Sequence, residues 1–301
     1  MMQPALHSTP RPREVLREHA RVLGRALRIP AVAVVGLMVL ATLLVISEVP
    51  RQGGGIDFHP ERYMLPALLG LVFPIVVWRG EDRFGPGFLW TLPVDRRRHA
   101  LAKVSAGWIW LMSAVALFVL WLFALTLLSG GSVLGEETVR VLSSPVPAPG
   151  TFADPGAVQT VRLAPQPLYW LTPFTAATGA YLLASALALG LRHPLRWIVG
   201  AALGLQLVVI AGDATNVEWL AQLPSRLLQP LYAGPYGIDT LVSARTESVE
   251  VRVTLPTGER VRAWRALPHL GRWAAATLLW TGVGLAILWA AASRHRELRR
   301  S

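Results

Sequence analysis

The residue types that usually carry catalysis occur in this chain of 301 residues without the spacings that catalysis needs. Its one lysine, Lys103, follows Leu101 and Ala102, so there is no glycine-rich phosphate loop ending in Gly-Lys. The absence of cysteine excludes thiol catalysis, disulfides and cysteine-bound zinc or iron–sulfur sites. There is also no His-Glu-x-x-His pair and no Gly-x-Ser-x-Gly turn. We therefore expect that the chain is not an enzyme and binds no cofactor itself.

The histidines and paired carboxylates give no stronger signal. The seven histidines are dispersed over the tails and the ends of apolar runs, and we expect solvated or interfacial side chains rather than a metal site. They are His7, His19, His59, His99, His193, His269 and His295. Glu136-Glu137 with Arg140 resembles an intramembrane protease signature, but the spacing is one residue short. No ionisable residue lies inside an apolar run, which argues against an intramembrane enzyme and against ion-coupled transport.

The composition places the chain among membrane proteins. It is 53% hydrophobic and only 16% charged, whereas soluble domains are typically about 25% charged. Disorder is excluded as well, because disordered chains contain few apolar residues. The net charge of +11 leaves two classes open, a nucleic-acid binder or a membrane protein whose arginines face the cytoplasm.

Six apolar runs predict an all-α integral membrane protein with six transmembrane helices. None of the runs contains Asp, Glu, Lys, Arg or His in its interior, and the second and fifth are the shortest. They cover residues 31–47, 63–78, 104–128, 168–191, 197–211 and 273–292. The first run follows an arginine-rich segment and precedes no small-x-small cleavage pattern, so we expect a retained helix rather than a signal peptide.

The positions of the arginines predict the orientation. With both termini in the cytoplasm, the inside segments are 1–30, 79–103, 192–196 and 293–301. They hold 18 of the 29 basic and 6 of the 18 acidic residues, which gives +12 inside and −1 outside. This agrees with the positive-inside rule and leaves no basic surface for nucleic acid.

The remaining segments complete the predicted domain organisation. Residues 1–30 form a cytoplasmic elbow, because 12–28 reads as a basic amphipathic helix of the kind that lies in the membrane interface; a plain arginine-rich topology anchor is the alternative. Residues 31–128 hold three spans and the 79–103 loop, 168–211 two spans, and 273–301 the last span with a basic tail. The extracytoplasmic segments 129–167 and 212–272 are predicted to contain strands at 138–142 and 158–163, a hairpin at 248–265 and short helices at 216–231 and 237–244. They form one small sheet or two unrelated hairpins.

The 79–103 loop combines charge with apolar side chains. It holds Phe84, Phe88, Leu89, Trp90 and Leu92 among arginines and carboxylates. Apolar anchors ringed by charge are typical of protein docking surfaces. An amphipathic helix on lipid headgroups is the alternative interpretation.

This loop resembles that of the permease subunits of type-2 ATP-binding-cassette (ABC) exporters. That family has an acidic residue, a glycine turn, a short leucine-rich helix, Leu-Pro-Val, a basic residue and a lysine, an order matched by Glu81, Gly85, Leu89, Leu92-Pro93-Val94, Arg96 and Lys103. The amphipathic N-terminal helix and the six spans with both ends inside also resemble the family. Gly85-Pro86-Gly87 departs from its usual turn, and the outside segments are larger than in its short form.

The resemblance implies a permease in the bacterial cytoplasmic (inner) membrane, paired with a second copy or a homologue. Two separate ATPase subunits, which hold ATP-Mg, would dock on the loop and drive export. The residues expected at this contact are Glu81, Arg83, Phe84, Phe88, Leu89, Trp90, Leu92, Pro93 and Arg96, with Arg192 and Arg196 as a smaller second contact. Charge-free spans favour a lipid-like, peptide or other amphipathic cargo over a small ion.

A second hypothesis is a membrane scaffold without transport activity, whose extracytoplasmic β-region binds a partner protein. The scaffold hypothesis accounts for the long outside segments but assigns no function to the 79–103 loop. A neighbouring reading frame that encodes an ATPase with a phosphate loop would favour the permease.

Overall fold

The chain folds into eight helices and four strands within the part that the structure describes. This computed structural model describes residues 12–52, 55–56, 58–60, 63–79, 96–131, 133, 137–142, 158–163, 170–215, 217–243, 246–254 and 260–294. The helices are α1 (Pro12–Gln52), α2 (Leu65–Val77), α3 (Arg96–Ser129), α4 (Thr172–Gly190), α5 (Pro194–Ala214), α6 (Glu218–Tyr232), α7 (Ile238–Ser243) and α8 (Leu270–Arg294).

Five helices are long and apolar enough to cross a bilayer, namely α1, α3, α4, α5 and α8. They cover five of the six predicted spans. The remaining one, predicted at 63–78, corresponds to α2, which has 13 residues. At 1.5 Å per residue it is about 20 Å long, shorter than the ~30 Å hydrocarbon core. By length and composition, five of the described helices can span a bilayer, and the sixth predicted span is not confirmed.

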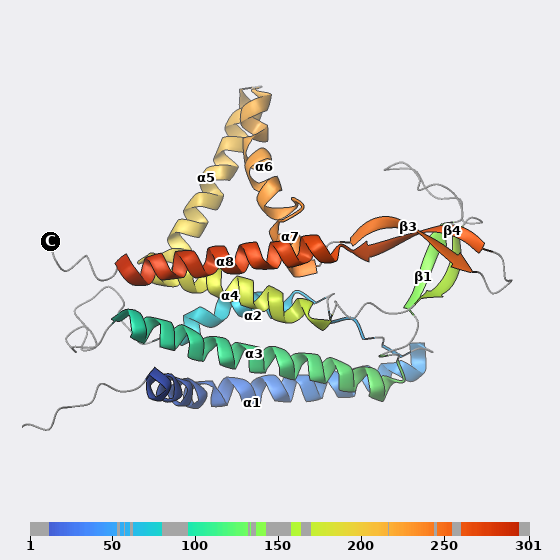
Figure 1. Cartoon of the computed structure of the whole chain (residues 1–301), viewed down its shortest axis with the longest axis horizontal. Coiled ribbons are helices and arrows are strands. Elements are labelled where there is room, and N and C mark those ends of the chain that lie inside the picture. Colours follow the sequence, from blue (N-terminus) through green and yellow to red (C-terminus); the bar gives the residue numbers. More distant parts are fainter. Residues whose placement is uncertain are drawn as a thin grey trace, which may run out of the picture.

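Helix α1 corrects the predicted boundary between an elbow helix and a first span. The two segments form one continuous helix of 41 residues. Pro30 lies inside it, where a proline removes a backbone hydrogen bond and favours a bend. In Figure 1 the first turns of α1 are seen nearly end-on and the later turns lie along the bundle.

Helices α1, α3, α4 and α8 lie side by side, with α2 against α3 and α4 (Figure 1). Helices α5 and α6 pack on each other and stand away from this bundle (Figure 1). In the 18-residue apolar stretch of α5 only 6% of the residues are buried, against 56% in that of α4. Helix α4 is thus the central element, and α5 is almost uncovered within one chain.

The strands form two separate antiparallel hairpins at one end of the bundle (Figure 1). β1 (Glu137–Leu142) pairs with β2 (Val158–Leu163), and β3 (Thr246–Thr254) pairs with β4 (Arg260–Pro268). Their ranges agree with the predicted strands to within a few residues. β1 lies near β4, but the described strands do not join into one sheet.

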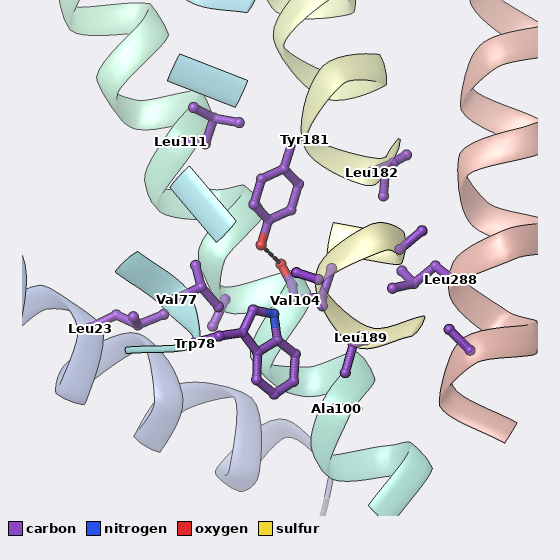
Figure 2. Packing of buried hydrophobic residues seen from close by; sticks show 14 of the residues in the cluster. Leu23, Val77, Trp78, Ala100, Val104, Leu111, Tyr181, Leu182, Leu189 and Leu288 are labelled. Carbon is purple, nitrogen blue, oxygen red and sulfur yellow. Dashed lines mark hydrogen bonds between the residues drawn. The ribbon is translucent and has the colours of Figure 1, made fainter. Parts of the chain in front are cut away.

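The centre of the bundle is built around Tyr181 of α4. Its side chain is fully buried, and its hydroxyl donates a hydrogen bond of 2.7 Å to the carbonyl oxygen of Val104 in α3 (Figure 2). Gly107 makes room for this contact, since a Cβ there would meet the Tyr181 hydroxyl and would lie 2.6 Å from Val77 Cγ2. Gly70 of α2 likewise lies against the α4 backbone, so α2, α3 and α4 approach closely because small residues line the contact.

Gly70→Ala is predicted to destabilise the fold. The added Cβ would lie 2.5 Å from the carbonyl oxygen of Ala177 and 3.1 Å from the backbone nitrogen of Tyr181, so α2 and α4 would have to separate. Overpacking of this kind costs about 1–3 kcal/mol. The measurement is the thermal unfolding midpoint of the detergent-solubilised protein.

Gly36→Ala is the matched control, because nothing lies within 4 Å of a Cβ at that position. Replacing an exposed helical glycine by alanine leaves stability unchanged or raises it by up to about 1 kcal/mol. Equal midpoints for the two variants would show that the α2–α4 contact is not close-packed.

Candidate functional site at the base of the 79–103 loop

The structure describes the two ends of the 79–103 loop but not its middle. Eight predicted docking residues lie outside the described part: Glu81, Arg83, Phe84, Phe88, Leu89, Trp90, Leu92 and Pro93. Arg96 is the first residue of α3. Arg192 and Arg196 are exposed at the connection between α4 and α5. The part of the candidate site that the structure describes is therefore the base of the loop.

The two ends of the loop are held together by an aromatic ring and a cation. Trp78 follows α2 directly and is only 4% exposed. Its backbone nitrogen bonds to the Pro74 carbonyl oxygen at 3.0 Å, which continues the helical pattern to the loop. Lys103 of α3 is buried, and its Nζ lies 4.9 Å from the centroid of the Trp78 ring. A cation at this position is attracted by the face of the indole.

The first part of α1 contacts the base of the loop from one side. The rings of His19 and His99 meet edge to face with centroids 4.6 Å apart. Leu23 is buried in the same core cluster as Trp78 and Ala100, and α1 crosses next to α3 there (Figure 2). The indole nitrogen of Trp110 donates a 2.9 Å hydrogen bond to the Ala20 carbonyl oxygen. Movement of the α3 start therefore has to move α1 or break these contacts.

The last turns of α8 contact the base from another side. The guanidinium carbon of Arg97 lies 3.0 Å from the centroid of the Trp289 ring. Leu189 of α4 and Leu288 of α8 belong to the core cluster that also holds Trp78 (Figure 2). The ends of α2, α4 and α8 and the beginnings of α1 and α3 thus meet at one end of the bundle.

This end of the bundle is strongly basic. Arg79, Arg98, Arg192 and Arg196 are exposed there, beside the arginines of α1. The acidic residues that the structure describes at this end are Glu14 and Glu18, both on α1. The electrostatic environment favours an anionic partner or membrane surface.

The contacts at this end of the bundle join helices to one another. Across the described ranges, no group of three or more His, Cys, Asp or Glu side chains could hold a metal ion. The contacts instead tie the two loop ends to each other and to α1 and α8. Such a base can pass a displacement of the loop to the helices.

Three contacts at the base were not predicted from the sequence: Trp78 with Lys103, His19 with His99, and Arg97 with Trp289. The histidines were expected to be solvated or interfacial, whereas His19 and His99 are partly buried and in contact. One signal was available for Lys103, because it is the only lysine among many arginines and it directly precedes the charge-free run of α3.

Comparison with known proteins adds no relative: no protein-family model, no curated protein and no solved structure matches the chain. Its class is therefore defined by its own helices. Five apolar helices of membrane-spanning length make it a multi-pass membrane protein.

Lys103→Met is predicted to loosen the base of the loop. It keeps most of the side-chain volume but removes the charge over Trp78, an interaction of about 0.5–2 kcal/mol. We expect a lower thermal midpoint and a changed tryptophan emission. Lys103→Arg, which keeps a cation over the ring, should lie closer to the wild type, and an equal loss in both variants would exclude the cation–π contact as the cause.

Proposed function

We propose that this chain is the membrane-spanning permease subunit of an ABC exporter, driven by a separate ATPase that docks on the 79–103 loop. The observation that carries the proposal is the construction of the loop base. Trp78 and Lys103 hold the two loop ends together, and α1 and α8 contact the start of α3 through His19 and Trp289. A loop that only connected two spans would not need a base joined to four helices.

In the proposed mechanism, the loop base transmits force from the ATPase subunits to the membrane helices. Closure of two ATPase subunits around ATP-Mg pushes the 81–92 segment, and the push reaches α2 and α3 through the loop ends. Because α2 and α3 both pack on α4, the spans tilt as rigid bodies and open a path outward or sideways into the lipid. The chain itself acts neither as an enzyme nor as a cofactor binder in this mechanism.

The proposed topology has six spans, with α2 as the short one and both termini in the cytoplasm of a bacterial inner membrane. Two features support it. The exposed side of α2 is apolar, with Leu68, Leu71, Val72 and Ile75, as a lipid-facing helix requires. The hairpins β1–β2 and β3–β4 lie at the end of the bundle opposite the basic loop base (Figure 1), so they would be extracytoplasmic.

A second permease copy is the proposed partner of α5. Gly200 and Gly204 lie one turn apart, and nothing in this chain lies within 4 Å of a Cβ at either position. The exposed Gln206 adds an amide to the otherwise apolar stretch 197–211 of this helix. Small residues allow close helix contact in a bilayer, and an amide there gains from a hydrogen bond across the contact. Helix α5 of a second copy supplies both.

Replacing Phe88, Leu89, Trp90 and Leu92 by serine is predicted to abolish recovery of the ATPase. The tagged chain is purified from membranes of its host, and ATP hydrolysis in the eluate is measured together with the identity of the co-purified proteins. Loss of central apolar anchors costs at least about 2 kcal/mol each, so the activity recovered should fall at least about thirtyfold.

The control replaces Trp219 and Leu228, two exposed apolar residues of α6, by serine. It should leave recovery of ATPase activity unchanged. Undiminished recovery with the loop variant would contradict docking at this loop.

Gly200→Leu combined with Gly204→Leu is predicted to lower the dimer fraction, because bulky side chains keep two α5 helices apart. Single-molecule photobleaching in vesicles counts the copies directly. Gly282→Leu is the control, since Gly282 of α8 is equally open in the single chain. A dimer fraction that is unchanged, or lowered equally by the control, argues against α5 as the contact.

The scaffold alternative has one observation in its favour. The two described hairpins lie next to each other at one end of the bundle and offer a surface of their own. If deletion of the β3–β4 hairpin removes a co-purified extracytoplasmic protein while no ATPase is recovered from the intact chain, the scaffold is the better description.

A further inference from the structure

The first part of α1 divides into three faces when its residues are placed at about 100° per residue. One face packs on the bundle. It includes Leu23, which is only 5% exposed, Ala20, whose carbonyl oxygen accepts the Trp110 hydrogen bond, and Gly24, where a Cβ would lie 2.7 Å from Trp110 Cζ2. These contacts fix the rotation of the helix, so the other two faces have defined directions.

The second face carries five exposed arginines. The four-residue spacing of Arg13, Arg17, Arg21 and Arg25, together with Arg28, places all of them within a sector of about 120°, which adjoins the packed face at Gly24 and also contains the exposed Glu14. Arg21 also contacts Glu18 at 3.1 Å, in a pair whose side chains are 53% and 64% exposed. An exposed ion pair of this kind is weak and leaves the guanidinium available to a stronger anion.

The third face is apolar and equally uncovered. Val22 is 61% exposed and Ile29 is 84% exposed, and the exposed Ala26 lies between them on the same side. This strip borders the arginine face. The helix then continues without interruption into the apolar segment that starts at residue 31.

We propose that this part of α1 is a binding site for the headgroups of anionic phospholipids, with the arginine face on the phosphates and the Val22–Ala26–Ile29 strip in the acyl boundary. An acidic protein segment or a nucleic acid would pair with the arginines but leave the apolar strip in water. A bilayer surface covers both faces at once. The inference rests on the proposed membrane placement of α1, but it does not depend on an ATPase partner.

The site is joined to the base of the 79–103 loop. His19 and Ala20, on the packed side of the same helix, contact His99 and Trp110 of α3. Headgroup binding on the arginine face therefore stabilises the arrangement of α1 against α3, and the lipid should raise the stability of the whole bundle.

The test titrates the detergent-solubilised full chain with phosphatidylglycerol or with phosphatidylcholine of the same acyl chains and follows the thermal unfolding midpoint. We expect phosphatidylglycerol to raise the midpoint clearly more than phosphatidylcholine, with a smaller difference in high salt. Replacing Arg17, Arg21 and Arg25 by glutamine should weaken the apparent affinity on the order of a hundredfold, and Arg25→Gln alone about fivefold.

Two controls separate charge from folding. The triple replacement by lysine keeps the charge and should stay within about threefold of the wild type. Arg226→Gln removes an exposed arginine from the other amphipathic helix, α6, and should leave the affinity unchanged. Circular dichroism of each variant shows whether the helices have formed.

The proposal is overturned if both lipids shift the midpoint equally, if the triple glutamine variant keeps the full effect, or if Arg226→Gln loses as much as Arg25→Gln. It is also overturned if sodium phosphate alone reproduces the shift, because the ligand is then a free anion. Recovery of the ATPase is measured separately. None of these outcomes therefore decides whether the proposed transport function is correct.

Discussion

Close contact between α4 and its neighbours is the constraint on which the rest of the structure depends. In a bilayer, lipid tails solvate apolar side chains as well as other helices do, so helices associate through tight packing and hydrogen bonds. Gly70, Gly107 and Gly284 provide that packing by bringing α2, α3 and α8 against α4. The Tyr181 hydroxyl adds a buried hydrogen bond to the α3 backbone. Helices α2, α3, α7 and α8 all rest on α4, and α1 is attached through α3.

The position of the loop base follows from this arrangement. Helix α2 ends and α3 begins at the same end of the bundle, and both helices pack on α4. A force applied to the 79–103 loop would therefore act on two helices that cannot slide freely past α4. The contacts of Lys103 with Trp78 and of Arg97 with Trp289 stiffen the point where the force would enter. Stiffness at the base and a packed centre are what a rigid-body tilt requires.

Sequence reasoning located the helices well, because uncharged runs of about 20 residues have few stable alternatives in a membrane. It placed the strands within a few residues for a similar reason, since alternation of apolar and polar residues is a local signal. It failed where tertiary contact decides. Helix α1 continues through Pro30, where a boundary between the elbow helix and the first span was predicted, whereas α2 (Leu65–Val77) lies within the predicted 63–78. The contact of His19 with His99 joins residues 80 positions apart, which no local spacing reveals.

The two least buried spans, α1 and α5, are held in different ways. Indole hydrogen bonds join α1 to α3, from Trp110 to the Ala20 carbonyl oxygen at 2.9 Å and from Trp121 to Thr42 Oγ1 at 2.8 Å. Helix α5 packs on α6, which itself stands away from the bundle (Figure 1). Contacts within the chain therefore fix α1 but leave the tilt of α5 to its surroundings, either the bilayer or another polypeptide. In the proposed topology the exposed Arg192 and Arg196 at its start would lie at the membrane surface, so α5 would pivot about that end.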